Sequence, residues 1–376
     1  MGYEGVAFVV AGNIVLNLSR ALCLLLVLLL LPACRSFGPD TLKGVHPLYN
    51  NAVNGSLNDQ FVQNLVRLHY HDPILFLDVS TIAASARLDV AGGLNQSQLG
   101  LPSAAYDLLK FSVGADYYEM PTVTFAPLQG EAFVKSLLNP ISLTSIFELT
   151  ASGWSAKRVF GLCIERINGL DNAPGASGPM PDTPPSQNAQ FIRLIDLLDK
   201  IRHAHLMAVK PDESGKELYL ELNEDGPHGR DVAEIKRLLE LDPSKNRFRL
   251  ATNLIMHDPS VISITTRSIG SIMFYLSHNV DTPAEHTEKG WVRLSHDAQG
   301  HPYDWSQTPA GQLFHIRVSS SHPDESFLAI PYNDHWFYIP QSDLQSKSTF
   351  MLLTQLFRLQ AGSAKSQTPA LTIPVR

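Results

Sequence analysis

Side chains suited to acid–base or binding chemistry gather in the polar stretch from residue 277 to residue 310. Histidine and carboxylate groups can move protons, and aromatic rings give a ligand flat surfaces to lie against. A long polar stretch with both is typical of a ligand-binding flap, and equally of a solvated insertion above packed aromatic side chains. The candidate ligand residues in this stretch are Trp291, His296, His301 and Asp304.

Two histidine pairs raise the question of a metal site, since the chain contains 14 histidines. His69 and His71 would share one face of a strand, as two ligands of one ion require, but they point about 200° apart on a helix. The apolar residues before His69 repeat at helical spacing, so we expect a helix. His203 and His205 also lie in a periodic segment, and we interpret His205 as a hydrogen-bonded core residue. We therefore expect neither a metal nor a cofactor.

Familiar catalytic motifs are missing from the sequence. It contains no G-x-S-x-G nucleophile elbow, no S-x-x-K pair, no H-E-x-x-H helix and no P-loop lysine. Catalytic residues that are far apart in the sequence would leave no such motif. The catalytic residues are therefore unassigned, and we favour a binding protein over an enzyme.

A leucine-rich run at residues 21–31 leads into the sequence L-P-A-C, which ends at Cys34. The run has the length of a signal-peptide core and is shorter than the ~20 residues that span a bilayer. The pattern resembles the lipobox of bacterial lipoproteins, which implies cleavage between Ala33 and Cys34 and fatty acyl chains such as palmitate on Cys34. Arg35, in place of the aspartate typical of inner-membrane lipoproteins, implies the outer membrane.

The alternative is an uncleaved membrane anchor over about residues 6–31, although Arg20 interrupts it. Residues 5–18 are also rather apolar, so the segment before the leucine-rich run is longer and less basic than a usual signal peptide. We infer that translation starts downstream of Met1.

Composition excludes several classes of protein. With a net charge of −7, the chain has no basic excess to neutralise the phosphates of nucleic acid. Hydrophobic residues make up 44% and charged residues 17%, which is typical of a folded body. Removal of Cys23 with the signal peptide and acylation of Cys34 would leave Cys163 without a disulfide partner. We expect Cys163 to be a small buried hydrophobic residue, with a reactive thiol as the alternative.

Changes in composition divide the chain into segments. Residues 35–58, rich in Gly, Asn, Pro and Ser, predict a tether. Residues 171–187 are dense in proline and glycine and favour polyproline II, as a rigid connector or as an exposed docking segment. The predicted organisation is a signal peptide (1–33), a flexible tether (34–58), an N-terminal α+β subdomain (59–170), a connector (171–187), a C-terminal α+β subdomain (188–360) and a tail (361–376).

The first half of the folded body combines short helices and strands. Asn58 or Asp59 is expected to cap a helix that Asp72-Pro73 stops. Alternating apolar residues predict strands at 74–90 and 119–126. Three helices follow, the second capped by Ser142 and the third running from a Ser155 cap to Asn168-Gly169.

The second half continues in the same manner. The expected helices lie near residues 191–205, 232–239, 268–276 and 352–359, and the expected strands near 218–222, 248–251, 313–318, 327–332 and 336–339. Asn333-Asp334 predicts a two-residue hairpin turn. The strand-like tail at 371–375 either frays or adds to a partner's sheet edge. Together the elements predict an α+β fold, with short helices packed on mixed or antiparallel sheets.

Five short segments resemble a family of uncharacterised proteobacterial envelope lipoproteins. They are FVQNLVRL (61–68), PLQGE (127–131), SGWS (152–155), RSI (267–269) and SKSTF (346–350). The resemblance covers most of residues 57–360 and implies an envelope location, but it carries over no activity and no catalytic residue.

These observations lead to one functional expectation and two alternatives. We expect a lipid-anchored outer-membrane protein that faces the periplasm and acts by binding or assembling with other envelope components, including a protein partner. The alternatives are an envelope hydrolase and a carrier of lipids or other small molecules.

Overall fold

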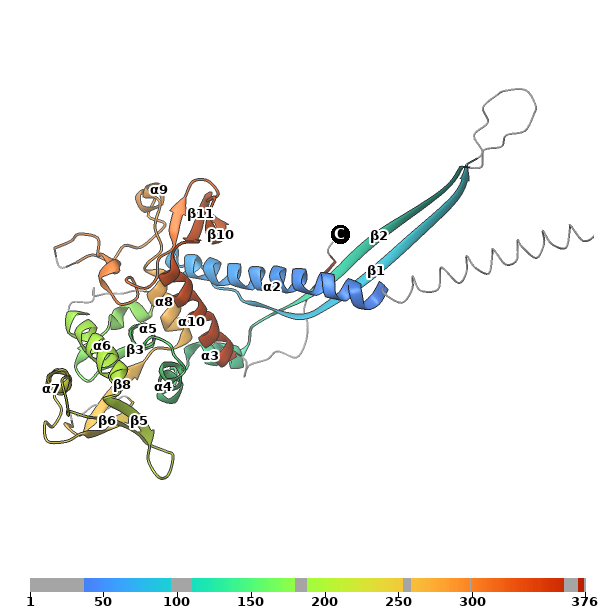
Figure 1. Ribbon diagram of the computed structural model, residues 1–376. Coiled ribbons are helices and arrows are strands. Elements are labelled where there is room, and N and C mark those ends of the chain that lie inside the picture. Colours follow the sequence, from blue (N-terminus) through green and yellow to red (C-terminus); the bar gives the residue numbers. More distant parts are fainter. Residues whose placement is uncertain are drawn as a thin grey trace, which may run out of the picture. The chain divides into compact units, whose positions relative to one another are not determined.

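The computed structural model describes residues 37–95, 110–179, 188–252, 258–297, 299–361 and 371–374 (Figure 1). The predicted signal peptide, its cleavage site at Ala33 and the acylation site Cys34 lie outside these residues. The chain divides into two compact units, residues 1–57 and residues 58–376. Helices combined with mixed and antiparallel sheets confirm the α+β class.

Helix α2 (Phe37–His69) begins far earlier than the predicted cap at Asn58 or Asp59. Residues 37–58, which composition assigned to a flexible tether, are helical, and this corrects the prediction. Pro39 is compatible with the helix because it falls in the first turn, where its missing N–H group has no bond to make. Nothing in the structure explains how the interior Pro47 is accommodated.

The end of α2 is anchored in the core of the second unit. Phe61 and Leu65 are buried on this stretch. The Asn64 side chain donates a 2.7 Å hydrogen bond to the Leu75 carbonyl and accepts a 3.1 Å bond from the Leu75 N–H group. These bonds hold the returning chain beside the helix, which fixes the position of His69 at the helix end.

Strands β1 (Leu77–Asn95) and β2 (Lys110–Pro127) pair as a long antiparallel ribbon. The predicted strands at 74–90 and 119–126 were too short, because β1 passes through Gly92 and Gly93 without ending. The tail strand β12 (Leu371–Pro374) pairs with β2 of the same chain. The tail was predicted either to fray or to add to the sheet of a partner protein, and both predictions were wrong. The ribbon and β12 form a three-stranded sheet in the order β1-β2-β12.

A six-stranded sheet forms the centre of the second unit, in the order β4-β3-β8-β7-β6-β5. Its strands are β3 (Ile164–Ile167), β4 (Leu170–Asp171), β5 (Met207–Pro211), β6 (Leu218–Leu222), β7 (Arg247–Ala251) and β8 (Val261–Thr266). Only β7 and β8 run parallel among the pairs described. Because β3 and β8 lie on opposite sides of the predicted connector, one sheet joins both predicted subdomains. The division into subdomains stays a prediction.

The other described helices all belong to the second unit. They are α3 (Glu131–Leu138), α4 (Leu143–Ala151), α5 (Ala156–Cys163), α6 (Asn188–His203), α7 (Gly229–Leu238), α8 (Ile269–Ser277), α9 (Ala284–Glu288) and α10 (Leu344–Ala361). The Ser142 hydroxyl accepts from the Ser145 N–H group at the start of α4, which confirms that cap. His205 lies beyond the end of α6 with φ 57° and is exposed, so its prediction as a core residue was wrong.

Helix α5 ends at Cys163 and not at Asn168-Gly169 as predicted. Residues from Ile164 to Ile167 leave the helix and pair with β8, because two β-branched isoleucines fit a half-buried sheet better than a helix end. Asn168 does adopt a left-handed backbone, with φ 48°, but in the turn between β3 and β4. Cys163 is fully buried, as expected.

The first part of the predicted connector, residues 171–179, packs into the core and is not an exposed link between two subdomains. Ala173 and Ala176 are 1% exposed, and residues 174–177 form a short 3₁₀ helix (η2). The buried Arg267 side chain donates to the carbonyls of Ile164 (2.8 Å), Ala173 (3.1 Å) and Asn172. Residues 180–187 of the connector lie outside the described residues.

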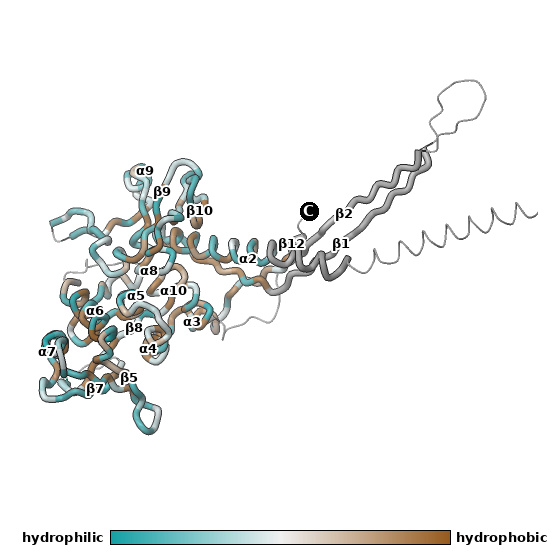
Figure 2. Tube along the Cα trace, in the orientation of Figure 1, coloured by the Kyte–Doolittle hydropathy of each residue, from teal (hydrophilic) through white to brown (hydrophobic). Residues whose placement is uncertain are grey.

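A second three-stranded sheet, in the order β10-β11-β9, completes the fold. It contains β9 (Arg317–Ser319), β10 (Ser326–Tyr332) and β11 (His335–Pro340). Asn333 and Asp334 both have positive φ, 45° and 62°, as the predicted two-residue hairpin turn requires. Within the described residues, no helix is both long and apolar enough to cross a membrane. The short surface helices α7 and α9 are coloured hydrophilic in Figure 2.

Candidate functional site

A cavity of about 270 Å³ lies where the end of α2, the end of α8 and the polar stretch 277–310 meet. Its volume is close to the lower limit for small-molecule sites. The wall combines histidines, carboxylates and aromatic rings, the groups that the sequence singled out as able to do chemistry. The residues that line the wall include His69, His278, Asp281, Asp304, Trp305 and His315.

His69 is a neutral and fully bonded wall residue. Its Nε2 atom lies 2.7 Å from the Thr282 hydroxyl. Burial lowers the pKa of His69 to about 4, although a hydrogen bond to the backbone of Ser277 acts in the opposite direction. The His69 ring is therefore held by the Thr282 hydroxyl and by the backbone of Ser277.

His278 follows α8 directly and differs from His69 in one respect. Its ring is stacked on Trp305, and burial lowers its pKa to about 4 against a hydrogen bond to the backbone of Ala176. Its Nε2 atom is buried and has no hydrogen-bond partner. A neutral imidazole carries a hydrogen on one nitrogen only, so Nε2 of His278 is an acceptor in the tautomer that has its hydrogen on Nδ1.

Asp281 and His315 form a hydrogen-bonded ion pair at the cavity. The Nε2 atom of His315 lies 2.6 Å from Oδ1 of Asp281. This bond is the main reason that the pKa of His315 is raised above its usual value. The backbone aligns the pair, because Val280 and Ile316 form a parallel bridge and the His315 N–H group donates to the Ser346 hydroxyl at 2.9 Å.

The four candidate residues from the sequence lie in different places. Asp304 lines the cavity, and bonds from Ser306 and Gln307 hold the pKa of its carboxyl below the usual range. Trp291 is 47% exposed and lies 4.7 Å, between ring centroids, from His286, away from the cavity wall. His296 and His301 are exposed on a turn, where the backbone of His296 bridges to Pro302.

The sequence did not single out the residues that make the cavity distinctive. His278 and Asp281 belong to the stretch 277–310, but neither was chosen as a candidate. His315 lies outside the stretch, and His69 was considered only as a metal ligand. One sequence feature could have pointed to His278. It directly follows a strongly apolar helix, and a polar residue in that position tends to be buried with the helix.

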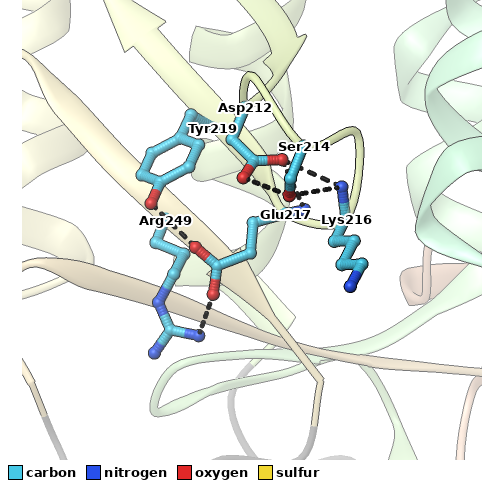
Figure 3. Close-up of polar contacts among 6 residues, drawn as sticks. All are labelled: Asp212, Ser214, Lys216, Glu217, Tyr219 and Arg249. Atoms are coloured by element: carbon cyan, nitrogen blue, oxygen red, sulfur yellow. Dashed lines mark hydrogen bonds and ion pairs between the residues drawn. The ribbon is translucent and has the colours of Figure 1, made fainter.

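A further group of polar side chains, at the turn between β5 and β6, has a structural role (Figure 3). The Asp212 carboxylate accepts from the N–H groups of Lys216 (2.9 Å) and Glu217 (3.0 Å), which closes the turn. These bonds and one from the Ser214 hydroxyl lower the pKa of Asp212 to about 2. Glu217 in turn accepts from Tyr219 at 2.9 Å. The polar side chains of this group bond to one another and to the backbone of the turn. We therefore infer that they stabilise the turn and do not bind a ligand.

An apolar cavity beside the six-stranded sheet is too small for a lipid. It measures about 30 Å³ and is lined by residues such as Phe147, Phe160 and Ile264. A single water needs roughly 10–15 Å³ on a comparable measure, so an acyl chain does not fit.

Comparisons with known proteins give no family, relative or structural neighbour for this chain. No protein family matches it, and neither a curated protein nor a solved structure does.

Proposed function

We propose that this chain is a lipid-anchored envelope protein that acts by binding. In this proposal Cys34 holds it at the outer membrane, and the body on the periplasmic side takes up a compact ligand that offers hydrogen-bond donors, such as hydroxyl or amino groups. The observation that carries the proposal is that His278, a residue that lines the cavity, has a buried Nε2 atom with no hydrogen-bond partner. A buried polar atom without a partner is rare in a folded protein and calls for an explanation.

The chemistry of the wall selects the ligand class. A buried acceptor left unbonded costs about 1–3 kcal/mol, so a ligand that donates to Nε2 of His278 recovers part of that cost on binding. Asp304 and Asp281 also line this wall, and the second carboxylate oxygen of Asp281 is not the one bonded to His315. Hydroxyl-rich and amino-bearing molecules fit this set better than molecules that carry acceptors alone.

The hydrolase alternative receives less support than binding. A serine nucleophile needs a histidine base within hydrogen-bond reach. Among the described residues, Ser295 and Ser306 line the cavity, and neither is hydrogen bonded to a histidine. The Nε2 atom of His315 is already engaged by Asp281. The small apolar cavity likewise gives a lipid carrier no support.

A binding experiment with two opposite probes tests the proposal. The full chain in detergent is titrated calorimetrically with glucosamine, which offers hydroxyl and ammonium donors, and with succinate, which offers only acceptors at neutral pH. We expect glucosamine to bind and succinate not to bind. His278→Phe keeps an aromatic ring on Trp305 but removes the acceptor, and it should weaken glucosamine binding at least tenfold, about 1.4 kcal/mol.

His301→Phe is the matched control, because it makes the same change at an exposed histidine outside the cavity. It should leave the affinity unchanged. Equal affinity for glucosamine in the His278→Phe variant, or no binding by glucosamine and by a panel of other sugars, amino sugars and amino acids, would contradict the proposal.

Assembly is a second candidate, and the β1–β2 ribbon favours it. Within the described residues, no strand pairs with the outer edge of β1, and β12 covers only residues 122–125 of β2. An unpaired edge is a template for another strand, and a two-stranded ribbon is marginally stable alone. In the register of the ribbon, Ile82 lies opposite Val123, Leu88 opposite Tyr117, and Val90 opposite Ala115.

The partner that suits two free edges of one ribbon is a second copy of this chain, with the β1 edge of one copy against the β2 edge of the next. The test is the mass of the full chain in detergent, compared with a variant in which residues 84–121 are replaced by a short turn. We expect an oligomer for the full chain and a monomer for the variant. A monomeric full chain would contradict assembly without affecting the binding proposal.

A further inference from the structure

A cluster of three metal-ligating side chains lies outside the cavity. Glu285 and His286 come from α9, and His335 comes from the start of β11. One ligand atom from each residue can be chosen so that all three lie within 4.8 Å of one another. We propose that this cluster is a binding site for a divalent transition metal of the zinc class.

The distances fit such an ion after a small contraction. Nε2 of His286 lies 3.5 Å from Oε1 of Glu285, and Nδ1 of His335 lies 3.9 Å from the same oxygen. Ligands at 2.0–2.2 Å from a tetrahedral zinc ion stand about 3.4 Å apart. The carboxylate of Glu285 is on an exposed side chain and can rotate towards both histidines.

The surroundings of His286 hold its ring in the orientation of a metal ligand. Its Nδ1 atom lies 2.7 Å from the Tyr70 hydroxyl, which leaves Nε2 for the ion. A metal-bound histidine usually has its second ring nitrogen engaged in this way, because that bond fixes the tautomer and the ring plane. His286 is 1% exposed and Tyr70 is 7% exposed, so the pair is built into the core. An exposed ion pair formed by chance would lack this support.

The ligand set narrows the class of metal. Two imidazoles and one carboxylate suit Zn²⁺ and its neighbours Cu²⁺ and Ni²⁺, whereas Ca²⁺ and Mg²⁺ prefer oxygen ligands alone. Three protein ligands leave a fourth position for water or another molecule. The sequence led us to expect no metal, because His286 and His335 lie far apart in the chain and form no spaced motif.

Zinc alone is the probe that tests the site. The untagged full chain in detergent is first stripped with a chelator and then titrated with Zn²⁺ against a competing chelator. We expect one equivalent to bind and the thermal midpoint of unfolding to rise with the zinc concentration. His335→Gln, a change at a partly exposed residue, should weaken this binding at least 100-fold. Tyr70→Phe, which removes the orienting hydroxyl, should weaken it 10–100-fold.

The control is His301→Gln, because His301 also lies 3.5 Å from a carboxylate, that of Asp297, but belongs to no such cluster. It should bind zinc like the wild type. X-ray absorption of the zinc-loaded chain should show four light ligands that include two imidazoles. The proposal is overturned if the wild type binds no zinc, or if His335→Gln and the wild type bind it equally well. Neither result bears on ligand binding in the His278 cavity.

Discussion

The imidazole of His278 stacks on the indole of Trp305, with ring centroids 4.2 Å apart and ring planes 10° from parallel. The stack fixes the orientation of the ring. The consequence is that an imidazole of the cavity wall is already in place before any ligand arrives. Such preorganisation reduces the entropic cost of binding.

Removing the stack should therefore weaken ligand binding as well as the fold. We expect Trp305→Ala to lower glucosamine affinity at least tenfold, and to lower the unfolding free energy by about 0.5–1.5 kcal/mol beyond the loss of buried area. Calorimetry and urea unfolding measure the two effects. Trp291→Ala is the control, since this exposed tryptophan is outside the cavity and should leave glucosamine affinity unchanged. Equal affinity in wild type and Trp305→Ala would refute the role of the stack.

The two neutral histidines should make the fold acid-sensitive. Burial lowers the folded pKa of His69 and of His278 to about 4, whereas an unfolded histidine titrates near 6.5. Between these values the unfolded chain binds more protons, so the unfolding free energy falls as the pH drops from 6.5 towards 4, by up to about 3 kcal/mol for each histidine. Urea unfolding across this range should show a shallower pH slope for His69→Gln than for the wild type. Identical slopes would contradict the assignment.

The Asp281–His315 pair should have the opposite pH dependence. The bond to Asp281 raises the folded pKa of His315, so its contribution is complete below the unfolded pKa and is lost as the pH rises through the folded one. Both side chains are nearly half exposed, which limits the contribution to below about 1 kcal/mol. The difference in unfolding free energy between wild type and Asp281→Asn should be larger at pH 5.5 than at pH 8.5. A difference that grows with pH would be inconsistent with the pair.

Arg267 should be among the most sensitive positions in the core. It is 1% exposed, and its guanidinium donates to four backbone carbonyls and, at 3.0 Å, to the Ser177 hydroxyl. Arg267→Met would remove one buried donor from each of these carbonyls and should cost about 2–4 kcal/mol of unfolding free energy. Arg230→Met, at an exposed position on α7, is the control and should change stability by less than about 0.5 kcal/mol. Similar losses for both variants would show that the network is unimportant.

The proposed anchor depends on one sulfur atom. Cys34→Ala should abolish incorporation of labelled palmitate and release the protein from the membrane fraction, because one acylated residue provides the attachment. Cys163→Ala, at the buried cysteine, should keep both label and membrane retention. If the Cys34→Ala protein still carries label and stays on the membrane, the lipoprotein proposal is wrong.

Local signals in the sequence predicted local features of the fold. Ser142 was expected to cap a helix, and its hydroxyl accepts the N–H group of Ser145. Asn333-Asp334 was expected to form a two-residue turn and does. Such features depend on a few neighbouring residues, so the sequence is sufficient to find them.

Features that depend on distant partners could not be predicted in this way. Helix α5 gives way to β3 at Ile164 because β8, about 100 residues later in the chain, offers an edge to pair with. The cavity likewise unites His69 with residues near 278 and 315, and no spacing in the sequence links them. Much of the cavity wall comes from the stretch 277–310, but of the four candidate residues chosen there only Asp304 lines the cavity.

The most direct test of the central claim observes His278 itself while a ligand binds. The full chain, labelled with ¹⁵N-histidine, is titrated with glucosamine, and the ring nitrogens are followed by NMR, with His278→Phe used to assign the signal. We predict that Nε2 of His278 begins as an unprotonated acceptor and shifts in a saturable manner as it accepts a hydrogen bond. A His278 signal that stays unchanged while glucosamine binds, or one that is protonated at neutral pH, would contradict the account.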